Sequence, residues 1–342
     1  MRTLKSENIM KPSFTHFIIP IAVCCVLSVA VVAQSQTAAK PATAAKPATS
    51  PKTFDTPQQA ADALIKAATD YNVPELLAIF GPDGEEIVTG GDDVQDKKNA
   101  ADFAKMAQEK NSVNLSVSDP NVATLVVGND DWPLPVPIVK KNGKWYFNSK
   151  AGKTEILYRR IGSNELDAIT VCRGYVDVQR EYALTPHDGI NQYAQKIIST
   201  PGKQDGLYWK NADGSSAGPI GEAVANAIEE GYSLKTKGGF HGYYFKILKG
   251  QGPDAPLGKI NYVIEGVMIG GFALVAVPAE YRVTGVKTFI VSNDGVVYQK
   301  DLGSNSLEIA KKMELYNPDK TWQPTDDEWP ESVAPVSGPD AP

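Results

Sequence analysis

The feature that most constrains this fold is a pattern that occurs twice along the chain: apolar residues at helical spacing, followed by short strands joined by tight turns. Thr56, Pro57 and Gln59 predict a helix start, because a threonine cap, an early proline and a glutamine at the third position favour it. Asn142-Gly143 and Asn293-Asp294-Gly295 each separate two strand-like runs and predict hairpins. Helices followed by antiparallel strands predict the α+β class.

Two folded segments are predicted, over residues 54–150 and 151–316. The first has helical patterns, then strand patterns, at 56–68, 74–80, 100–107, 114–118, 122–127 and 138–147. The second has three helical patterns, then strand patterns, at 168–182, 190–198, 220–228, 243–248, 262–267, 272–277, 288–291 and 296–300. Each segment is therefore expected to bury helices against an antiparallel sheet.

The ends of the chain have a different composition. Residues 1–33 run from basic to apolar to small residues, the order of a secretory signal. We expect a signal peptide that is cleaved after Ala33 and a protein of the periplasm or cell envelope; an uncleaved N-terminal anchor is the alternative. Residues 34–53 are rich in Ala, Lys, Pro and Thr and are expected to be a linker, and the acidic, proline-rich residues 317–342 a disordered tail.

Charge limits the partners. The formal net charge is −6, and removing residues 1–33 takes away three basic residues and one acidic residue, which leaves −8. No basic cluster remains to displace counterions from nucleic acid. We expect no nucleic-acid partner and no membrane span after signal cleavage, which leaves an envelope protein as the expected kind of partner.

The sequence shows no catalytic constellation. Only Cys172 remains after residues 1–33 are removed, so no internal disulfide can form, and it is expected in the core. His187-Asp188 is interpreted as the cap of the 190–198 helix. Asp92-Asp93 and Asp130-Asp131 offer carboxylates but lack the spacing of a calcium loop. No catalytic residue, metal site or cofactor is predicted.

Aromatic side chains supply the best candidates for a binding surface, although such residues concentrate in cores as well. The candidates are Tyr208, Trp209, Phe240, His241, Tyr243, Tyr244 and Phe245. The core interpretation is favoured for them as a group. A partner surface is nevertheless expected on the sheet over 238–302, where Gly270-Gly271 would let another backbone approach closely.

Several contiguous runs resemble one exported bacterial family, catalogued as domain of unknown function 2950. They are Gly206–Trp209, Gly242–Leu248, Gly271–Tyr281, Val283–Val291 and Asp294–Leu302. The resemblance extends from Phe54 to the tail and implies no activity, because the family has none assigned. In architecture, residues 54–150 resemble the nuclear transport factor 2-like cone, and residues 155–305 resemble the head of type IV pilin-like proteins.

These observations predict an exported envelope protein that is a non-enzymatic binding or assembly module. The alternative is an enzyme that uses a cavity in residues 54–150, with a carboxylate such as Asp130 or Glu155 as acid or base. An open pocket with a buried carboxylate would favour the enzyme, and a filled core would favour the binding module.

Overall fold

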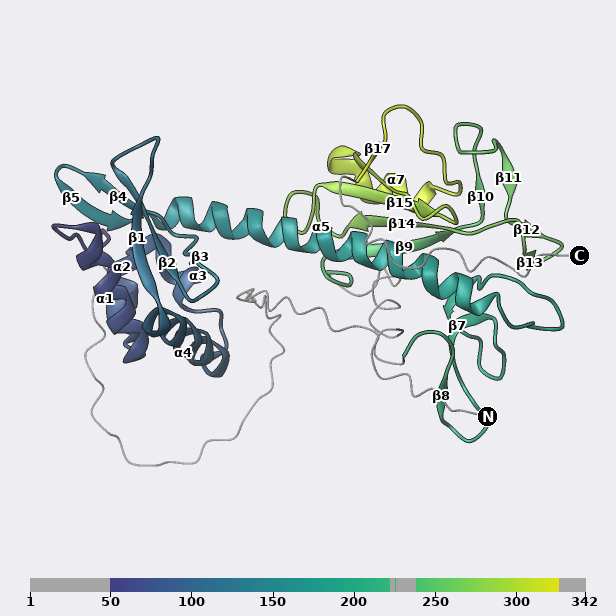
Figure 1. Ribbon diagram of the computed structural model, residues 1–342, viewed down its shortest axis with the longest axis horizontal. Helices are drawn as coiled ribbons and strands as arrows, with labels where there is room; N and C mark the ends of the chain where they lie inside the picture. The colour runs from purple at the N-terminus through teal and green to yellow at the C-terminus, as the bar shows by residue number, and fades with distance from the viewer. Residues whose placement is uncertain (1–49, 222–224, 226–237, 326–342) are drawn as a thin grey trace, which may run out of the picture. The chain divides into compact units, whose positions relative to one another are not determined.

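The computed structural model describes residues 50–221, 225 and 238–325 (Figure 1). The signal sequence, nearly all of the linker and most of the helix predicted over 220–228 lie outside the described residues. The chain divides into two compact units at Tyr158 and Arg159, a few residues beyond the boundary expected from sequence. Each unit combines helices with antiparallel strands, so the α+β class is confirmed.

The first unit opens with helices that begin and end at the predicted signals. Thr56 caps α1 (Pro57–Thr69) by accepting the Gln59 N–H at 3.1 Å. Gln59 in turn accepts the N–H of Asp55, which satisfies a second donor at the helix start. The helix α2 (Val73–Phe80) ends at Gly81, whose φ of 69° suits glycine. A 3-10 turn η1 (Pro82–Gly84), α3 (Glu85–Val88) and α4 (Asp93–Glu109) follow.

An antiparallel sheet completes the first unit. The strands are β1 (Asn111–Leu115), β2 (Val122–Val127), β3 (Trp132–Pro133), β4 (Ile138–Lys141) and β5 (Lys144–Phe147). The order is β1-β2-β4-β5, with β3 also paired to β2. Asn142 (φ 52°) and Gly143 (φ 80°) form the predicted turn between β4 and β5, while β1 begins three residues earlier than the pattern at 114–118 indicated.

The core of the first unit lies between the helices and this sheet. Small residues on α1 allow close helix packing, and larger side chains from α2 and the strands fill the remaining space. Its buried members are Ala60, Ala61, Leu64, Ala67, Ala68, Leu76, Ile79, Phe80, Ala104, Ala107, Ala123, Leu125, Val127, Val136, Ile138, Trp145 and Phe147.

The helix α5 (Ser149–Tyr182) begins in the first unit and ends in the second. Its 34 residues include the stripe predicted from apolar spacing, and Cys172, Tyr175 and Val176 are buried on it. Among the described residues, no helix has the length and apolar content that crossing a bilayer requires.

The second unit is built on a five-stranded antiparallel sheet of order β17-β16-β15-β14-β9. These strands are β9 (Tyr243–Leu248), β14 (Ala273–Pro278), β15 (Lys287–Ser292), β16 (Val297–Asp301) and β17 (Gln323–Pro324). The remaining elements are β6 (Lys196–Ile198), β7 (Gly206–Lys210), β8 (Ser216–Ala217), β10 (Gly250–Gln251), β11 (Ile260–Asn261), β12 (Val263–Ile264), β13 (Val267–Met268), η2 (Gly303–Asn305) and α7 (Ser306–Lys312).

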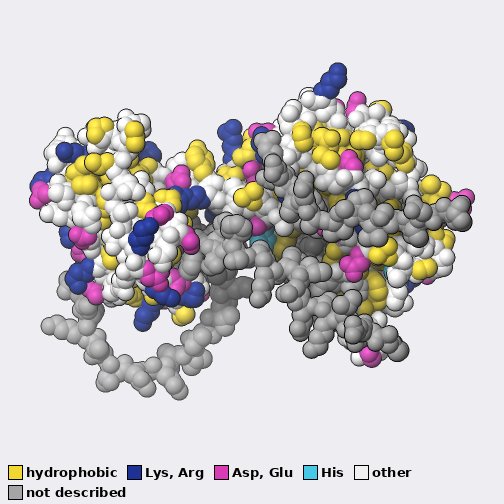
Figure 2. Space-filling model, viewed as in Figure 1, with side chains coloured by type: hydrophobic (Ala, Val, Ile, Leu, Met, Phe, Trp, Pro, Cys, Tyr) yellow, Lys and Arg dark blue, Asp and Glu magenta, His cyan; other side chains and the backbone are white. Residues whose placement is uncertain are grey.

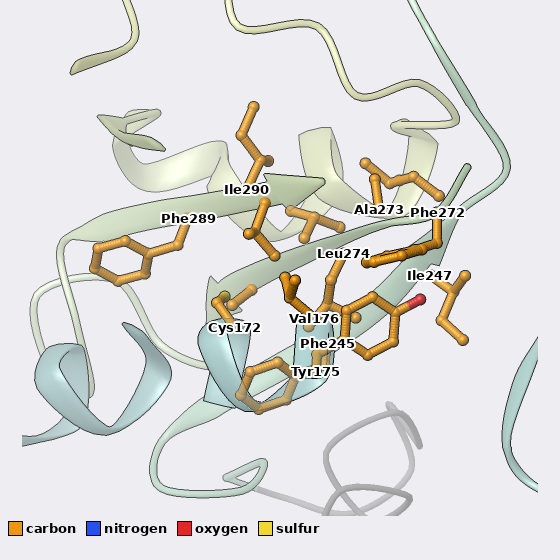
Figure 3. Packing of buried hydrophobic residues seen from close by; sticks show 14 of the residues in the cluster. Cys172, Tyr175, Val176, Phe245, Ile247, Phe272, Ala273, Leu274, Phe289 and Ile290 are labelled. Carbon is orange, nitrogen blue, oxygen red and sulfur yellow. The ribbon is translucent and has the colours of Figure 1, made fainter. Parts of the chain in front are cut away.

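Both faces of this sheet are covered. The register places Phe245 opposite Ala276, and Ala276 opposite Phe289, so their side chains share one face. Figure 3 shows α5 beneath that face, with Cys172 and Tyr175 in the cluster, while Ile290 points to the other side, where α7 lies. Coverage on both sides explains why β14 is buried along its whole length.

The prediction of a helix over residues 190–198 is wrong. Lys196–Ile198 instead forms β6, which pairs in parallel with β7. Upstream, the Gln179 side chain donates to the Ala194 carbonyl and accepts the Ala194 N–H, both at 2.8 Å. The Gln179 side chain thus satisfies both backbone groups of Ala194, as a neighbouring strand would. A short apolar run with helical spacing is therefore held in an extended conformation. No helix follows Asp188, so its predicted role as a helix cap is wrong as well.

Two strand-level predictions also change. Residues 262–267 form a tight hairpin rather than one strand, because Glu265 (φ 50°) and Gly266 (φ 85°) turn the chain between β12 and β13. The first part of the expected tail is folded instead, since Gln323–Pro324 pairs with β16 and Trp322 is buried at 8% exposure, and residues 326–342 lie outside the described residues. The indole of Trp322 supplies the apolar surface that keeps this acidic segment on the sheet.

Candidate functional site

The first unit contains a cavity of about 120 Å³, called the α4 cavity below. It is open to solvent on one side and is bordered by the helices, by β3 with the residues after it, and by the first turns of α5. Its lining is Leu64, Ala68, Leu76, Phe80, Glu86, Ile87, Val88, Gly90, Asp96, Asn99, Ala100, Phe103, Met106, Trp132, Leu134, Pro135, Val136 and Ile156.

One helix supplies the most varied part of this wall. Asp96, Asn99, Ala100, Phe103 and Met106 follow each other along α4 at steps of three, one, three and three residues, which places them on one helix face. Asp92 caps the start of α4 with its side chain. The helix therefore presents a polar end and an apolar end to the same space.

The polar end centres on Asp96. Its side chain is buried, with 8% of the residue exposed, in a wall that is otherwise mostly apolar. The Gly90 N–H donates to both carboxylate oxygens, at 2.9 Å each. Asn99 stands one turn further along, where its side-chain oxygen accepts from Gln95 at 2.7 Å.

The rim of the cavity carries a second carboxylate that is already paired. Glu86 lies in α3, and its side chain is 70% exposed. Its Oε2 forms an ion pair with Lys153 Nζ at 3.0 Å. Exposed pairs of this kind contribute little to stability, about 0 to 1 kcal/mol. The pair marks the solvent side of the cavity, whereas Asp96 marks the buried side.

The negative charge of Asp96 affects a neighbouring hydroxyl. Burial raises the pKa of Tyr71, and the carboxylates of Asp96 and Asp93 raise it further. The Tyr71 hydroxyl donates to the Asp93 carbonyl at 3.4 Å.

The carboxylates singled out from sequence do not line this cavity. Asp130 is exposed beside β2, and Glu155 lies on α5 outside the lining. Asp96 was missed. Its signal was present, because Asp96 precedes Ala100 by four residues and Phe103 by seven, and so lies on the apolar stripe of the predicted helix.

The aromatic candidates of the second unit are spread over three elements. Tyr208 and Trp209 lie on β7, Phe240 and His241 precede β9, and the other three lie on β9. Tyr208, Tyr243, Tyr244 and Phe245 are buried in the second core, whereas Phe240 and Trp209 are half-buried and His241 is exposed. Tyr243 donates to the Lys287 carbonyl at 2.8 Å, and its ring packs 5.8 Å from that of Phe289.

His241 is the candidate that reaches the surface. Its Nδ1 lies 2.7 Å from Asp167 Oδ2 on α5, and its ring meets Phe240 edge to face at 4.3 Å. No nucleophilic hydroxyl or thiol completes a catalytic arrangement with this pair among the described contacts. The binding role predicted for the aromatic group stays a prediction.

The other histidine of the second unit, His187, contacts neighbouring side chains and backbone in the described residues. His187 is buried and stacks on Tyr182 with ring centroids 3.7 Å apart. Its Nε2 lies 3.0 Å from the Tyr182 carbonyl. Cys172 is fully buried, and burial raises the pKa of its thiol to about 12, so the reactive thiolate is not formed near neutral pH.

The acidic pairs have local roles. Asp92 caps α4 by accepting from Val94 and Gln95. Asp131 pairs with Lys110 at 2.7 Å. In the part of the chain that the structure describes, no group of three or more His, Cys, Asp or Glu side chains is placed to hold a metal ion. On the face drawn in Figure 2, acidic and basic side chains are interspersed over the first unit.

Fold and cavity together define a two-unit α+β protein with an apolar cavity in its first unit. The family model described as "Protein of unknown function (DUF2950)" matches residues 51–325, and the chain belongs to this family. No curated protein matches the chain, and no solved structure matches it.

Proposed function

We propose that this protein is an exported, non-enzymatic binding protein whose first unit holds a small, largely apolar molecule in the α4 cavity. The observation that carries the proposal is the cavity itself. Its volume of about 120 Å³ compares with the roughly 150 Å³ of an engineered apolar cavity that binds benzene. Ligand sites are typically concave, mostly apolar and fitted with a few polar groups, and this lining matches that description.

The location rests on the sequence. The basic, apolar and small segments of residues 1–33 favour export, and the linker over 34–53 would separate the folded units from the site of attachment or release. Assembly with an envelope protein through the second unit is a further part of this proposal. The likeness to a nuclear transport factor 2-like cone and to a pilin head also stays a prediction.

One observation favours the enzyme as a second candidate. Asp96 is a buried carboxylate in the cavity wall, the kind of group that can act as general acid or base. The described lining brings no second titratable group beside it except Glu86 at the rim, which is paired with Lys153. An open pocket with a buried carboxylate is what the enzyme hypothesis predicts. We nevertheless propose binding, because the described lining places no second, unpaired titratable group beside Asp96.

Methionine methyl groups give a direct test. Met106 lines the cavity, whereas Met268 and Met313 belong to the second unit. With ¹³C-labelled methionine methyls, toluene should shift the Met106 signal in a saturable way and leave Met268 and Met313 unchanged. If toluene leaves Met106 unmoved at concentrations near its solubility, the cavity is not a binding site.

A matched pair of variants sharpens this test. Ala100→Leu adds volume inside the cavity and should weaken toluene binding, because the side chain takes the space of the ligand. Ala101→Leu makes the same change on the exposed side of α4 and should leave binding unchanged. Equal effects of the two variants would show that the Met106 shift does not report on the cavity.

A further inference from the structure

Asp96 lies in the first turn of α4, where the helix N-terminus favours a carboxylate, but no cation of the described residues forms an ion pair with it. A carboxylate has about four acceptor positions, and only the single Gly90 N–H reaches its two oxygens in the described contacts. Buried charges in proteins are normally paired, because leaving one unpaired in an apolar setting is costly. The site is therefore incomplete on the side that faces the cavity.

Among the described residues, the cations nearest Asp96 do not pair with it, and Lys97, the next residue along, is exposed on α4. Lys98, two residues along α4, pairs with Asp102 at 3.1 Å. Lys153, at the rim, pairs with Glu86 at 3.0 Å. Within the described residues, no Lys or Arg forms an ion pair with Asp96. A complementary positive charge would have to enter with the ligand.

We propose that the molecule held in the α4 cavity is a small cationic amphiphile, with a primary amine or similar N–H donor on Asp96 and an apolar body beside Phe103 and Met106. This inference rests on the proposed binding function and names its ligand class. The helix face explains the arrangement, since Asp96 and Met106 lie ten residues apart on α4, at opposite ends of one wall.

The competing explanation is that Asp96 only holds the Gly90 loop in place. The variant Asp96→Asn separates the two roles. An asparagine side-chain oxygen can still accept the Gly90 N–H, but it removes the negative charge. Asp102→Asn is the matched control, because it removes the same charge from the same helix outside the cavity lining.

The experiment compares benzylamine with toluene on the full mature chain, again through the Met106 methyl signal. In the wild type, benzylamine should bind at least about tenfold more tightly than toluene, as a charge-assisted hydrogen bond would provide. In Asp96→Asn this preference should disappear while toluene still binds, and Asp102→Asn should behave like the wild type.

Failure of this inference differs from failure of the proposed function. If toluene binds the wild type but benzylamine binds no more tightly, the cavity is a binding site and the amine assignment is wrong. The same conclusion holds if Asp96→Asn keeps the preference for benzylamine. If neither probe moves Met106, both proposals fall. The wild-type comparison needs no variant, so it remains decisive even if Asp96→Asn does not fold.

Discussion

At the scale of single residues, burial and hydrogen bonding can shift the pKa of a carboxyl group in opposite directions. Burial raises the pKa of the Cys172 thiol to about 12, although the charge of Arg173 acts to lower it. Burial also acts to raise the pKa of Asp205, but hydrogen bonds from Lys196 and Thr200 outweigh it and lower that pKa to about 2. Asp205 thereby connects the two ends of the turn between β6 and β7.

Asp205 should therefore make stability depend on pH. Its pKa is lower in the folded chain than in the unfolded chain, so its contribution is present above about pH 4 and is lost as pH falls towards 2. We expect Asp205→Asn to lower the free energy of unfolding by about 1 to 2 kcal/mol at pH 7. Urea unfolding at pH 7 and pH 2.5 measures this, and the difference from wild type should shrink at the lower pH.

The partner of Asp205 provides the control for this experiment. Lys196→Met removes the Nζ donor that lies 2.9 Å from Asp205 Oδ2. It should reproduce part of the loss at pH 7 and weaken the pH dependence in the same direction. A pH-independent loss in Asp205→Asn would mean that the carboxylate charge does not stabilise this turn.

At the scale of elements, edge pieces complete the second sheet. The strand β17 contributes two residues, Gln323–Pro324, and pairs with β16 opposite Gln299 and Tyr298. The Lys300 ammonium lies 5.7 Å from the centre of the Trp322 ring, a cation–π arrangement. A proline at a sheet edge fits this position, because it needs no further backbone donor there.

Trp322 should anchor this edge. Trp322→Ala removes a large buried side chain, and we expect a loss of about 3 kcal/mol in the free energy of unfolding. The control is Lys320→Ala, an exposed change two residues away that should cost less than about 0.5 kcal/mol. Chemical denaturation compares them. Equal stability of the two variants would show that residues 320–325 contribute nothing to the sheet.

At the scale of the whole molecule, the chain builds two separate cores rather than one. The hydrophobic core cluster of the first unit ends at Phe147, and that of the second begins at Ala168 on α5. The described residues contain one cysteine, Cys172, and it is buried and unpaired, so both cores depend on packing. Export of this chain depends on residues 1–33 acting as the predicted signal sequence.

Export is testable with a reporter. A fusion of residues 1–52 to alkaline phosphatase, which is active only when its disulfides form outside the cytoplasm, should give active enzyme and a shortened fusion product in fractionated cells. Replacing the apolar run with a polar segment of equal length is the control and should abolish activity. An active fusion that keeps its full length would support export with an uncleaved anchor.

The sequence by itself determined the elements whose signals are local. The α1 cap at Thr56, the Asn142-Gly143 turn and the strands β2 and β9 follow from backbone and capping preferences within a few residues. The α+β class followed from the order of these elements.

Only the tertiary structure decided the features that depend on residues far apart in the chain. Residues 190–198 form β6 because Gln179 and β7 supply partners that no local pattern reveals. Sequence favoured a core position for Tyr243 and Phe245 without excluding a surface one, and the layers that cover their sheet place both in the core. The cavity forms where six segments of the first unit meet beside Asp96. The sequence shows Asp96 on the apolar stripe of its helix, but not that the space next to it is unfilled.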